Sequence, residues 1–340
     1  MNPAHDDGDV KIWLGDAVDC LESMPAAIAQ TCVTSPPYWG LRDYGADGQI
    51  GLEDSPDAYV ARIVEVFRSV RRVLRDDGTL WLNLGDSYAA DRGGTYQPAE
   101  TLAGGTSGRM SDGSKTNRGR GEGYQPSRNA RSYGLKHKDL VGIPWRVAFA
   151  LQADGWYLRS DIIWHKPNPM PESITDRPTK SHEYVFLLSK SPRYYYDADA
   201  IAEQSAGLGE TKIRFGGSKY GDSDDPKHAT KSGNTYTDSG TRNARSVWTI
   251  ATKPYAEAHF ATFPTELPER CIKAGSRPGD TVLDPFMGSG TTAWVARHHG
   301  RQAIGCEINP DYLNIASGRL QQLSLLDAGA SHSGSLTAFA

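Results

Sequence analysis

One stretch near the C-terminus of this 340-residue chain constrains the fold more than any other. It reads as a strand (TVLDPF), a glycine-containing loop (MGSG), a helix (TTAWVARHHG) and a second strand (QAIGCEIN). Parallel strands joined by a helix occur in sheets that helices cover on both faces. Other strands alternate with helices along the chain, so the sequence predicts an α/β protein with a doubly wound, mostly parallel sheet.

The glycine loop suits a ligand that contains adenosine. Glycines let the backbone approach a ligand, and the N-terminus of the following helix offers free N–H groups. Glu307 lies seventeen residues after Gly290, where a carboxylate can accept hydrogen bonds from ribose hydroxyls. The loop lacks the lysine of a nucleotide-triphosphate loop and the third glycine of a dinucleotide loop. The other interpretation is a helix N-terminus with turn glycines and no ligand.

A second pattern, TSPPYWG, follows the predicted strand QTCV. Two prolines fix the backbone and remove two N–H donors, so carbonyls and the Ser35 hydroxyl remain as acceptors beside Tyr38. Such a turn suits a planar group with an amino substituent, because the acceptors bind the amino hydrogens and the ring stacks on the face. Electron density returned to the nitrogen would then let it attack an activated methyl group directly. A purely structural Pro-Pro turn is the alternative that this pattern alone leaves open.

The charge distribution and the cysteines limit which partners and ligands the chain is expected to bind. The net charge of −4 argues mildly against nucleic acid, but residues 92–138 hold nine Lys and Arg against three acids. This segment is either a local surface for phosphates or a solvated loop without a partner. The four cysteines form no CxxC pair, so neither a zinc site nor a disulfide framework is expected. No apolar run reaches the roughly 18 residues of a membrane span, and the polar N-terminus predicts a cytoplasmic protein of a bacterium or phage.

Together, the two patterns resemble the amino-methyltransferases of DNA, in the permuted, beta-type group whose catalytic motif precedes the cofactor motif. DPFMGSGTT resembles the cofactor motif and TSPPYWG the catalytic motif, and further segments between residues 10 and 325 match in the family's order. LGDAVDCLESMP resembles the segment whose acid contacts the cofactor adenine, and IIWHKPNPMPES the stretch that frames the target base. HFATFPTEL resembles the segment that closes over the methionine part of the cofactor.

The resemblance implies a Rossmann-like sheet of seven strands in circularly permuted order, with one antiparallel strand in the final hairpin. It implies S-adenosylmethionine as cofactor and no metal. The implied catalytic residues are Ser35, Pro36, Pro37 and Tyr38. The implied cofactor-binding residues are Asp16, Thr34, Phe263, Asp284, Phe286, Gly288, Ser289, Gly290, Thr291 and Glu307.

The target base follows from the first catalytic position. In the resembling group, serine there usually accompanies cytosine N4, and an acid or amide accompanies adenine N6, so Ser35 favours N4. Adenine N6 stays the alternative, followed by an RNA or small-molecule substrate and a catalytically silent DNA-binding module. Methylation at cytosine C5 needs a cysteine nucleophile, normally after a proline, and no cysteine here follows one. The target base must leave the duplex stack.

The expected organisation alternates sheet segments with polar inserts. The boundaries are residues 10–88 for the catalytic half, 89–137 for a mobile basic loop, 138–202 for the remaining sheet and target pocket, 203–250 for a target-recognition insert, 251–325 for the cofactor half and 326–340 for a disordered tail. A helix is expected from Tyr59 to Arg75, ended by Asp76-Asp77-Gly78. The expected partners are double-stranded DNA with a short recognition sequence and a cognate restriction endonuclease, with the chain acting as a monomer or homodimer.

Overall fold

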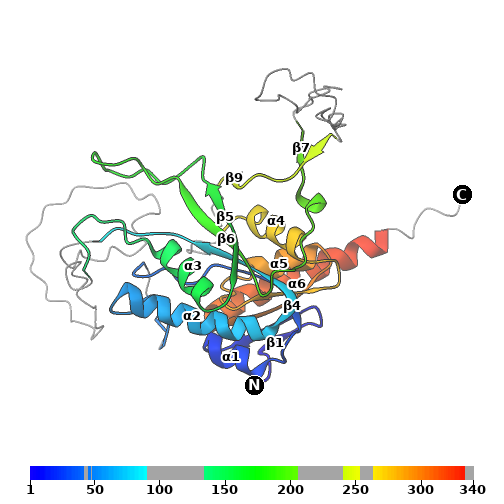
Figure 1. Ribbon diagram of the computed structural model, residues 1–340. Helices are drawn as coiled ribbons and strands as arrows, with labels where there is room; N and C mark the ends of the chain where they lie inside the picture. Colours follow the sequence, from blue (N-terminus) through cyan, green and yellow to red (C-terminus); the bar gives the residue numbers. More distant parts are fainter. Residues whose placement is uncertain (42–44, 47, 90–133, 206–239, 253–262, 334–340) are drawn as a thin grey trace, which may run out of the picture. The chain divides into compact units, whose positions relative to one another are not determined.

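The computed structural model describes residues 1–41, 45–46, 48–89, 134–205, 240–252 and 263–333 (Figure 1). The chain divides into two compact units. The larger unit consists of residues 1–196 and 246–340, and the smaller one of residues 197–245. Most of the predicted basic loop, residues 90–133, and residues 206–239 of the predicted insert lie outside the described residues.

The described part of the larger unit contains one sheet of nine strands (Figure 1). In spatial order they are β1 (His5–Asp6), β2 (Val10–Leu14), β11 (Gln302–Glu307), β10 (Thr281–Asp284), β3 (Ala29–Thr34), β4 (Leu74–Leu84), β6 (His182–Ser189), β5 (Tyr157–His165) and β9 (Val247–Thr249). Strands β2, β11, β10, β3 and β4 are parallel neighbours, whereas β6 runs antiparallel to both β4 and β5. The predicted seven-stranded sheet is therefore confirmed, with two short strands added at its edges.

The circular permutation is also confirmed. Strands β10 and β11 come last in the chain, yet they lie between β2 and β3 in the sheet. The C-terminal glycine-loop unit thus completes a sheet that the N-terminal half begins.

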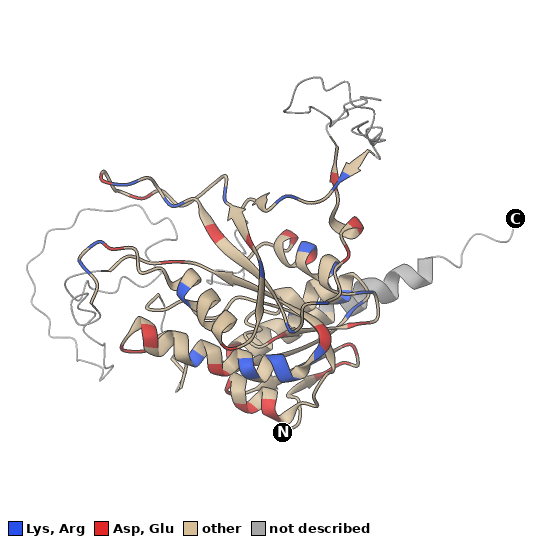
Figure 2. Ribbon diagram, viewed as in Figure 1, with Lys and Arg blue, Asp and Glu red and all other residues tan. Residues whose placement is uncertain are grey.

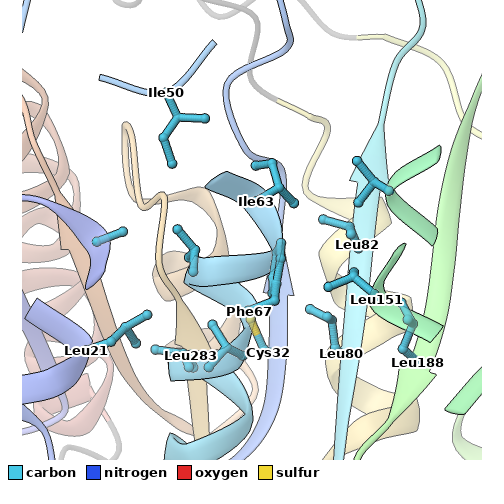
Figure 3. Packing of buried hydrophobic residues seen from close by; sticks show 14 of the residues in the cluster. Leu21, Cys32, Ile50, Ile63, Phe67, Leu80, Leu82, Leu151, Leu188 and Leu283 are labelled. Atoms are coloured by element: carbon cyan, nitrogen blue, oxygen red, sulfur yellow. The ribbon is translucent and has the colours of Figure 1, made fainter. Parts of the chain in front are cut away.

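Six helices cover the sheet in the part that the structure describes. They are α1 (Ala17–Ser23), α2 (Pro56–Val73), α3 (Ile143–Ala153), α4 (Glu266–Gly275), α5 (Thr291–His298) and α6 (Pro310–Ser333). α1, α2 and α3 pack side by side on one face, and α4, α5 and α6 form a second group on the other (Figure 1). The residues of β4 alternate between the two layers, as a pleated strand requires. Leu80 and Leu82 point to the core beside Phe67 of α2 (Figure 3). The indole of Trp81 instead faces Gly275 of α4.

The boundary between α2 and β4 differs from the prediction. The helix begins at Pro56 behind an N-cap at Ser55, whose Oγ accepts a hydrogen bond from Ala58 N, and it ends at Val73. Leu74 is fully buried and already pairs with Ala29 as the first residue of β4. Burial of Leu74 therefore ends the helix before Asp76-Asp77-Gly78 is reached. The predicted stop residues instead lie within the strand, beside a shift of register between β3 and β4.

Two other boundaries differ. The structure continues α6 to Ser333, into the segment predicted to be a disordered tail. The predicted insert is also too long at its end. Strand β9 belongs to the main sheet, parallel to β5, because Trp248 is buried there. In the smaller unit, β7 (Glu203–Gln204) pairs antiparallel with β8 (Thr241–Arg242).

Candidate active site

The predicted site residues gather at one edge of the sheet. Thr34 ends β3, Asp284 ends β10 and Glu307 ends β11, and these strands are parallel neighbours. After β10 the chain continues to its neighbour β11 on one side, and after β3 it continues to its neighbour β4 on the other side. The boundary between β10 and β3 is therefore a topological switch point, where α/β sheets bind ligands. Thr34 Oγ1 donates a hydrogen bond of 2.6 Å to Asp284 Oδ1, across 250 residues of sequence. This contact joins the Ser35–Tyr38 turn to the glycine loop.

The backbone of the glycine loop needs its glycines. Gly288 and Gly290 have φ angles of +54° and +78°, which residues with side chains rarely adopt. A Cβ on Gly290 would also lie 2.9 Å from the Cβ of Ala316 in α6. Gly290 precedes α5 without any side-chain cap, so the first N–H groups of that helix remain available to a ligand.

Glu307 stabilises this loop through hydrogen bonds to two backbone N–H groups. Its Oε2 accepts a hydrogen bond from Gly288 N at 2.7 Å, and its Oε1 accepts one from Asn309 N at 2.8 Å. Burial raises the pKa of the Glu307 carboxyl above its ordinary value. Each carboxylate oxygen has capacity for a second hydrogen bond. The structure therefore leaves room for the predicted contact with ribose hydroxyls, which stays a prediction.

The other predicted cofactor residues lie around this loop. Asp16 follows β2 and caps α1, with Oδ1 accepting from Val18 N at 2.8 Å, and Gly15 N donates to the carbonyl of Glu307. Asp284 is buried, which raises its pKa, and it also accepts from Phe286 N at 3.0 Å. Phe263 is half-buried ahead of α4, and residues 259–262 of its segment lie outside the described part.

Arg319 of α6 is a loop contact that the sequence did not reveal. Its Nη1 donates to the carbonyl of Ser289 at 2.7 Å, with Ser289 Oγ at 3.1 Å and Thr291 Oγ1 at 3.2 Å. An arginine on a helix surface gives no sequence signal for such a role, because the packing of α6 on α5 decides what it contacts.

In the Ser35–Tyr38 turn, two of the carbonyls already accept hydrogen bonds from within the protein. Pro37 O accepts from Tyr59 Oη at 2.9 Å, and Tyr38 O accepts from Leu41 N at 3.2 Å. Within the described residues, no hydrogen bond reaches the Pro36 carbonyl. The acceptors that remain for a ligand are therefore the Ser35 hydroxyl and the first carbonyls of the turn.

The Tyr38 ring is held by residues that sequence reasoning missed. It lies against Gly85, where an added Cβ would be 2.5 Å from Tyr38 Cε2. Its hydroxyl donates to Glu183 Oε2 at 2.7 Å, beside Asn83 Oδ1 at 3.3 Å. Burial and the neighbouring Glu183 raise the pKa of Tyr38 well above its ordinary value, so the phenol stays protonated. The available signal was a charged residue, Glu183, at the start of an otherwise apolar strand.

The loop between β5 and β6, residues 166–181, carries charges of both signs (Figure 2) and contains one internal ion pair. Arg177 Nη1 pairs with Glu172 at 2.8 Å and its guanidinium lies 3.9 Å from the centre of the Tyr88 ring. Burial lowers the pKa of Lys180 in the same loop. The segment predicted to frame the target base thus has a defined conformation.

The described residues contain no group of three or more His, Cys, Asp or Glu placed to hold a metal ion. None of the helices in the described ranges is long and apolar enough to cross a membrane. All four cysteines are free and buried.

A doubly wound sheet with a glycine loop and a Ser-Pro-Pro-Tyr turn at its switch point defines a Rossmann-like methyltransferase with permuted motifs. Residues 29–318 match the family model N6_N4_Mtase, described as DNA methylase. The chain belongs to this DNA methylase family.

Known relatives agree over nearly the whole chain. The type II methyltransferase M.Cfr9I of Citrobacter freundii is 48% identical over 310 residues, which cover 91% of this chain and 87% of the relative. M.SmaI of Serratia marcescens is 47% identical, with 91% and 90% covered. Among solved structures, the PvuII DNA methyltransferase (cytosine-N4-specific) matches with a TM-score of 0.60 at 20% identity, over 94% of this chain and 89% of that one, which shows the shared fold. The Thermus thermophilus protein TTHA0409, complexed with S-adenosyl-L-methionine, matches with a TM-score of 0.53 at 26% identity, over 91% and 92%.

Proposed function

We infer that this DNA methylase transfers a methyl group from S-adenosylmethionine to the N4 amino group of a cytosine in double-stranded DNA. The observation that carries the proposal is the hydrogen bond between Thr34 and Asp284. It places a turn of hydrogen-bond acceptors directly beside a glycine loop that suits an adenosine cofactor. A methyl donor and an amino acceptor can therefore meet at this edge of the sheet.

The residues present fit the cofactor. Gly288 and Gly290 allow close backbone approach, the N-terminus of α5 is open, and Glu307 can accept from ribose. Asp16 is proposed to contact the adenine and Phe263 the methionine part. When bound, S-adenosylmethionine supplies a methyl group activated by its positive sulfur, and the bound cofactor of TTHA0409 supports this choice.

The turn is proposed to activate the target nitrogen. The lone pair of an amino group on a base is delocalised into the ring, which makes the nitrogen a weak nucleophile. Ser35 Oγ and the Pro36 carbonyl accept its two hydrogens, while the Tyr38 ring stacks on the base. The nitrogen forms the new N–C bond as the S–C bond breaks, and it then loses one proton to water.

A covalent intermediate is not needed in this scheme. Burial raises the pKa of Cys32, a residue of β3, well above its ordinary value, which disfavours the thiolate that attack on a cytosine ring would require. The cysteines are buried within the fold rather than presented at the turn. Direct attack by the amino nitrogen is the simpler step.

The choice of cytosine over adenine as the target base rests on Ser35, because serine at this position usually accompanies cytosine N4 in the group that the chain resembles. The segments 89–137 and 203–250 are proposed to contact the DNA and to read its sequence. The type II names of the relatives support a place beside a cognate restriction endonuclease.

The test is methyl transfer from labelled S-adenosylmethionine to unmodified plasmid DNA and to transfer RNA, with buffer alone as the blank. We expect label in DNA only, and a rate close to background for Ser35→Ala. Label in RNA but not in DNA would overturn the substrate. Cofactor binding without transfer to DNA of varied sequence would indicate a silent binding module.

A further inference from the structure

Glu183 occupies an unusual position for a carboxylate. It is the second residue of β6, and its side chain is only 16% exposed. Its Oε1 pairs with Lys166 Nζ, and its Oε2 accepts from Tyr38 Oη at 2.7 Å and from Asn83 Nδ2 at 3.1 Å. We call these four residues, Tyr38, Asn83, Lys166 and Glu183, the Tyr38 anchor.

The anchor is rigid on the side away from the turn. Lys166 Nζ lies 4.3 Å from the centre of the Trp164 ring, and the buried Trp164 donates through Nε1 to Ile250 O at 2.9 Å. Asn83 Nδ2 also donates to the carbonyl of Tyr184, the neighbour of Glu183 on β6. A half-buried ion pair gives little net stability, since desolvation offsets the attraction. A role beyond folding therefore accounts better for this arrangement.

The donors and acceptors of the anchor fix the direction of a hydrogen-bond chain. An ammonium group only donates and an ionised carboxylate only accepts. The single hydrogen of Tyr38 Oη therefore goes to Glu183 Oε2 at 2.7 Å rather than to Asn83 Oδ1, which is a neutral acceptor at 3.3 Å. Tyr38 Oη then accepts from Ser35 Oγ, which lies 3.4 Å away. Because a hydroxyl has one hydrogen and two lone pairs, Ser35 is left with lone pairs for the target amine.

We propose that Glu183 is a positioning residue that, through Tyr38, orients the Ser35 hydroxyl as an acceptor for the target amino group. This inference rests on the proposed function. If Tyr38 were free to donate to Ser35, the Ser35 hydrogen could turn toward the amine, and two donors would face each other. The raised pKa of Tyr38 keeps its hydrogen in place over the working pH range.

The sharpest variant is Glu183→Gln, which keeps the shape of the side chain. The amide oxygen would turn to Lys166, so the NH₂ group would face Tyr38 Oη. The Tyr38 hydrogen would then turn to Ser35 Oγ or Asn83 Oδ1, and the present direction of the chain would be lost. We expect the single-turnover rate of methyl transfer to fall about 10- to 100-fold, the loss typical of one catalytic hydrogen bond. Affinities for S-adenosylmethionine and for DNA should change less than about twofold, because neither ligand depends on this hydrogen.

Two further variants separate positioning from folding. Tyr38→Phe retains the ring and removes the same link, so its rate should fall similarly. The double variant should then be no slower than the slower single one, because both changes break one chain. Glu269→Gln is the matched control, since Glu269 of α4 pairs with Lys273 at 2.6 Å, remote from the turn, and its rate should be normal.

A normal rate for Glu183→Gln, or losses that multiply in the double variant, would overturn the inference. If Glu183→Gln melts below the assay temperature, Tyr38→Phe decides alone, because it leaves the Lys166–Glu183 pair in place, and a normal rate would again overturn it. Wild-type protein that does not methylate DNA would refute the proposed function instead. The two failures are thus distinguishable.

Discussion

The glycine loop and the Ser35–Tyr38 turn lie at the same edge of the sheet but are held in different ways. The loop is fixed mainly by its backbone conformation and by contacts within the C-terminal part of the chain, such as the hydrogen bond between Gly288 and Glu307. The turn is fixed by side chains from other elements, above all Tyr59 of α2 and Glu183 of β6. Under the proposed function, cofactor binding would therefore depend on local chain geometry, whereas positioning of the target base would depend on tertiary contacts.

The largest expected effect separates chemistry from cofactor binding. Ser35→Ala removes an acceptor and Tyr38→Ala removes the stacking ring, so each should lower the methyl-transfer rate about 100- to 1000-fold. Cofactor affinity, measured by calorimetry, should stay within about twofold of wild type, since neither change touches the glycine loop. Normal rates for both variants would show that the turn is not the catalytic site.

Gly290→Ala should have the opposite profile. The φ angle of +78° and the overlap with Ala316 both oppose a side chain there. We expect cofactor affinity to fall about 10- to 100-fold by calorimetry, while DNA binding in a gel-shift assay is retained. Gly318→Ala is the control, because a Cβ at this position in α6 meets no atom within 4 Å. Equal affinities for the two variants would contradict the assigned loop geometry.

Gly85→Ala tests the support of the turn with a single methyl group. The added Cβ would lie 2.5 Å from the Tyr38 ring, so the ring must move. The rate of methyl transfer should fall roughly tenfold, and cofactor affinity should not change. A wild-type rate would mean that the exact ring position matters little for transfer.

The smallest expected effect is a loss of cofactor affinity at acidic pH. Burial raises the pKa of Glu307, and only the charged carboxylate is a full acceptor for ribose, so cofactor affinity should weaken as the pH falls through this raised pKa. Folding responds with the opposite sign. The fold favours protonated Glu307, so this group's contribution to stability is present at low pH and is lost as the pH rises.

Calorimetric titrations with S-adenosylmethionine between neutral pH and about pH 5 would measure this dependence. Glu307→Gln should bind more weakly at neutral pH and lose this part of the pH dependence. A variant with an unchanged pH profile would show that another group titrates.

The strand–loop–helix–strand unit near the C-terminus could be predicted because its signals are local. Asp284, Gly288, Gly290 and Glu307 follow one another at spacings that a single strand–loop–helix–strand unit dictates. The permuted sheet followed from the order of the motifs. The end of α2 was predicted wrongly because burial of Leu74 outweighs the Asp-Asp-Gly signal beside it.

The residues that support the Ser35–Tyr38 turn could not be predicted. Glu183 lies 145 residues from Tyr38, and Asn83 lies 100 residues from Glu183. They meet because β4 and β6 pair in one register, Asn83 with Val185 and Leu84 with Tyr184. A shift by one residue would turn these side chains to the other face of the sheet. Strand register is a property of the whole fold, and sequence patterns do not reveal it.

The most direct test of the account is the identity of the methylated nucleoside. Unmodified DNA would be incubated with the wild-type protein and S-adenosylmethionine, digested to nucleosides and analysed by mass spectrometry. We expect N4-methylcytosine, and only in reactions with an intact Ser35. N6-methyladenine would retain the fold and direct transfer but contradict the choice of base, and 5-methylcytosine or no methylated nucleoside would contradict the proposed chemistry itself.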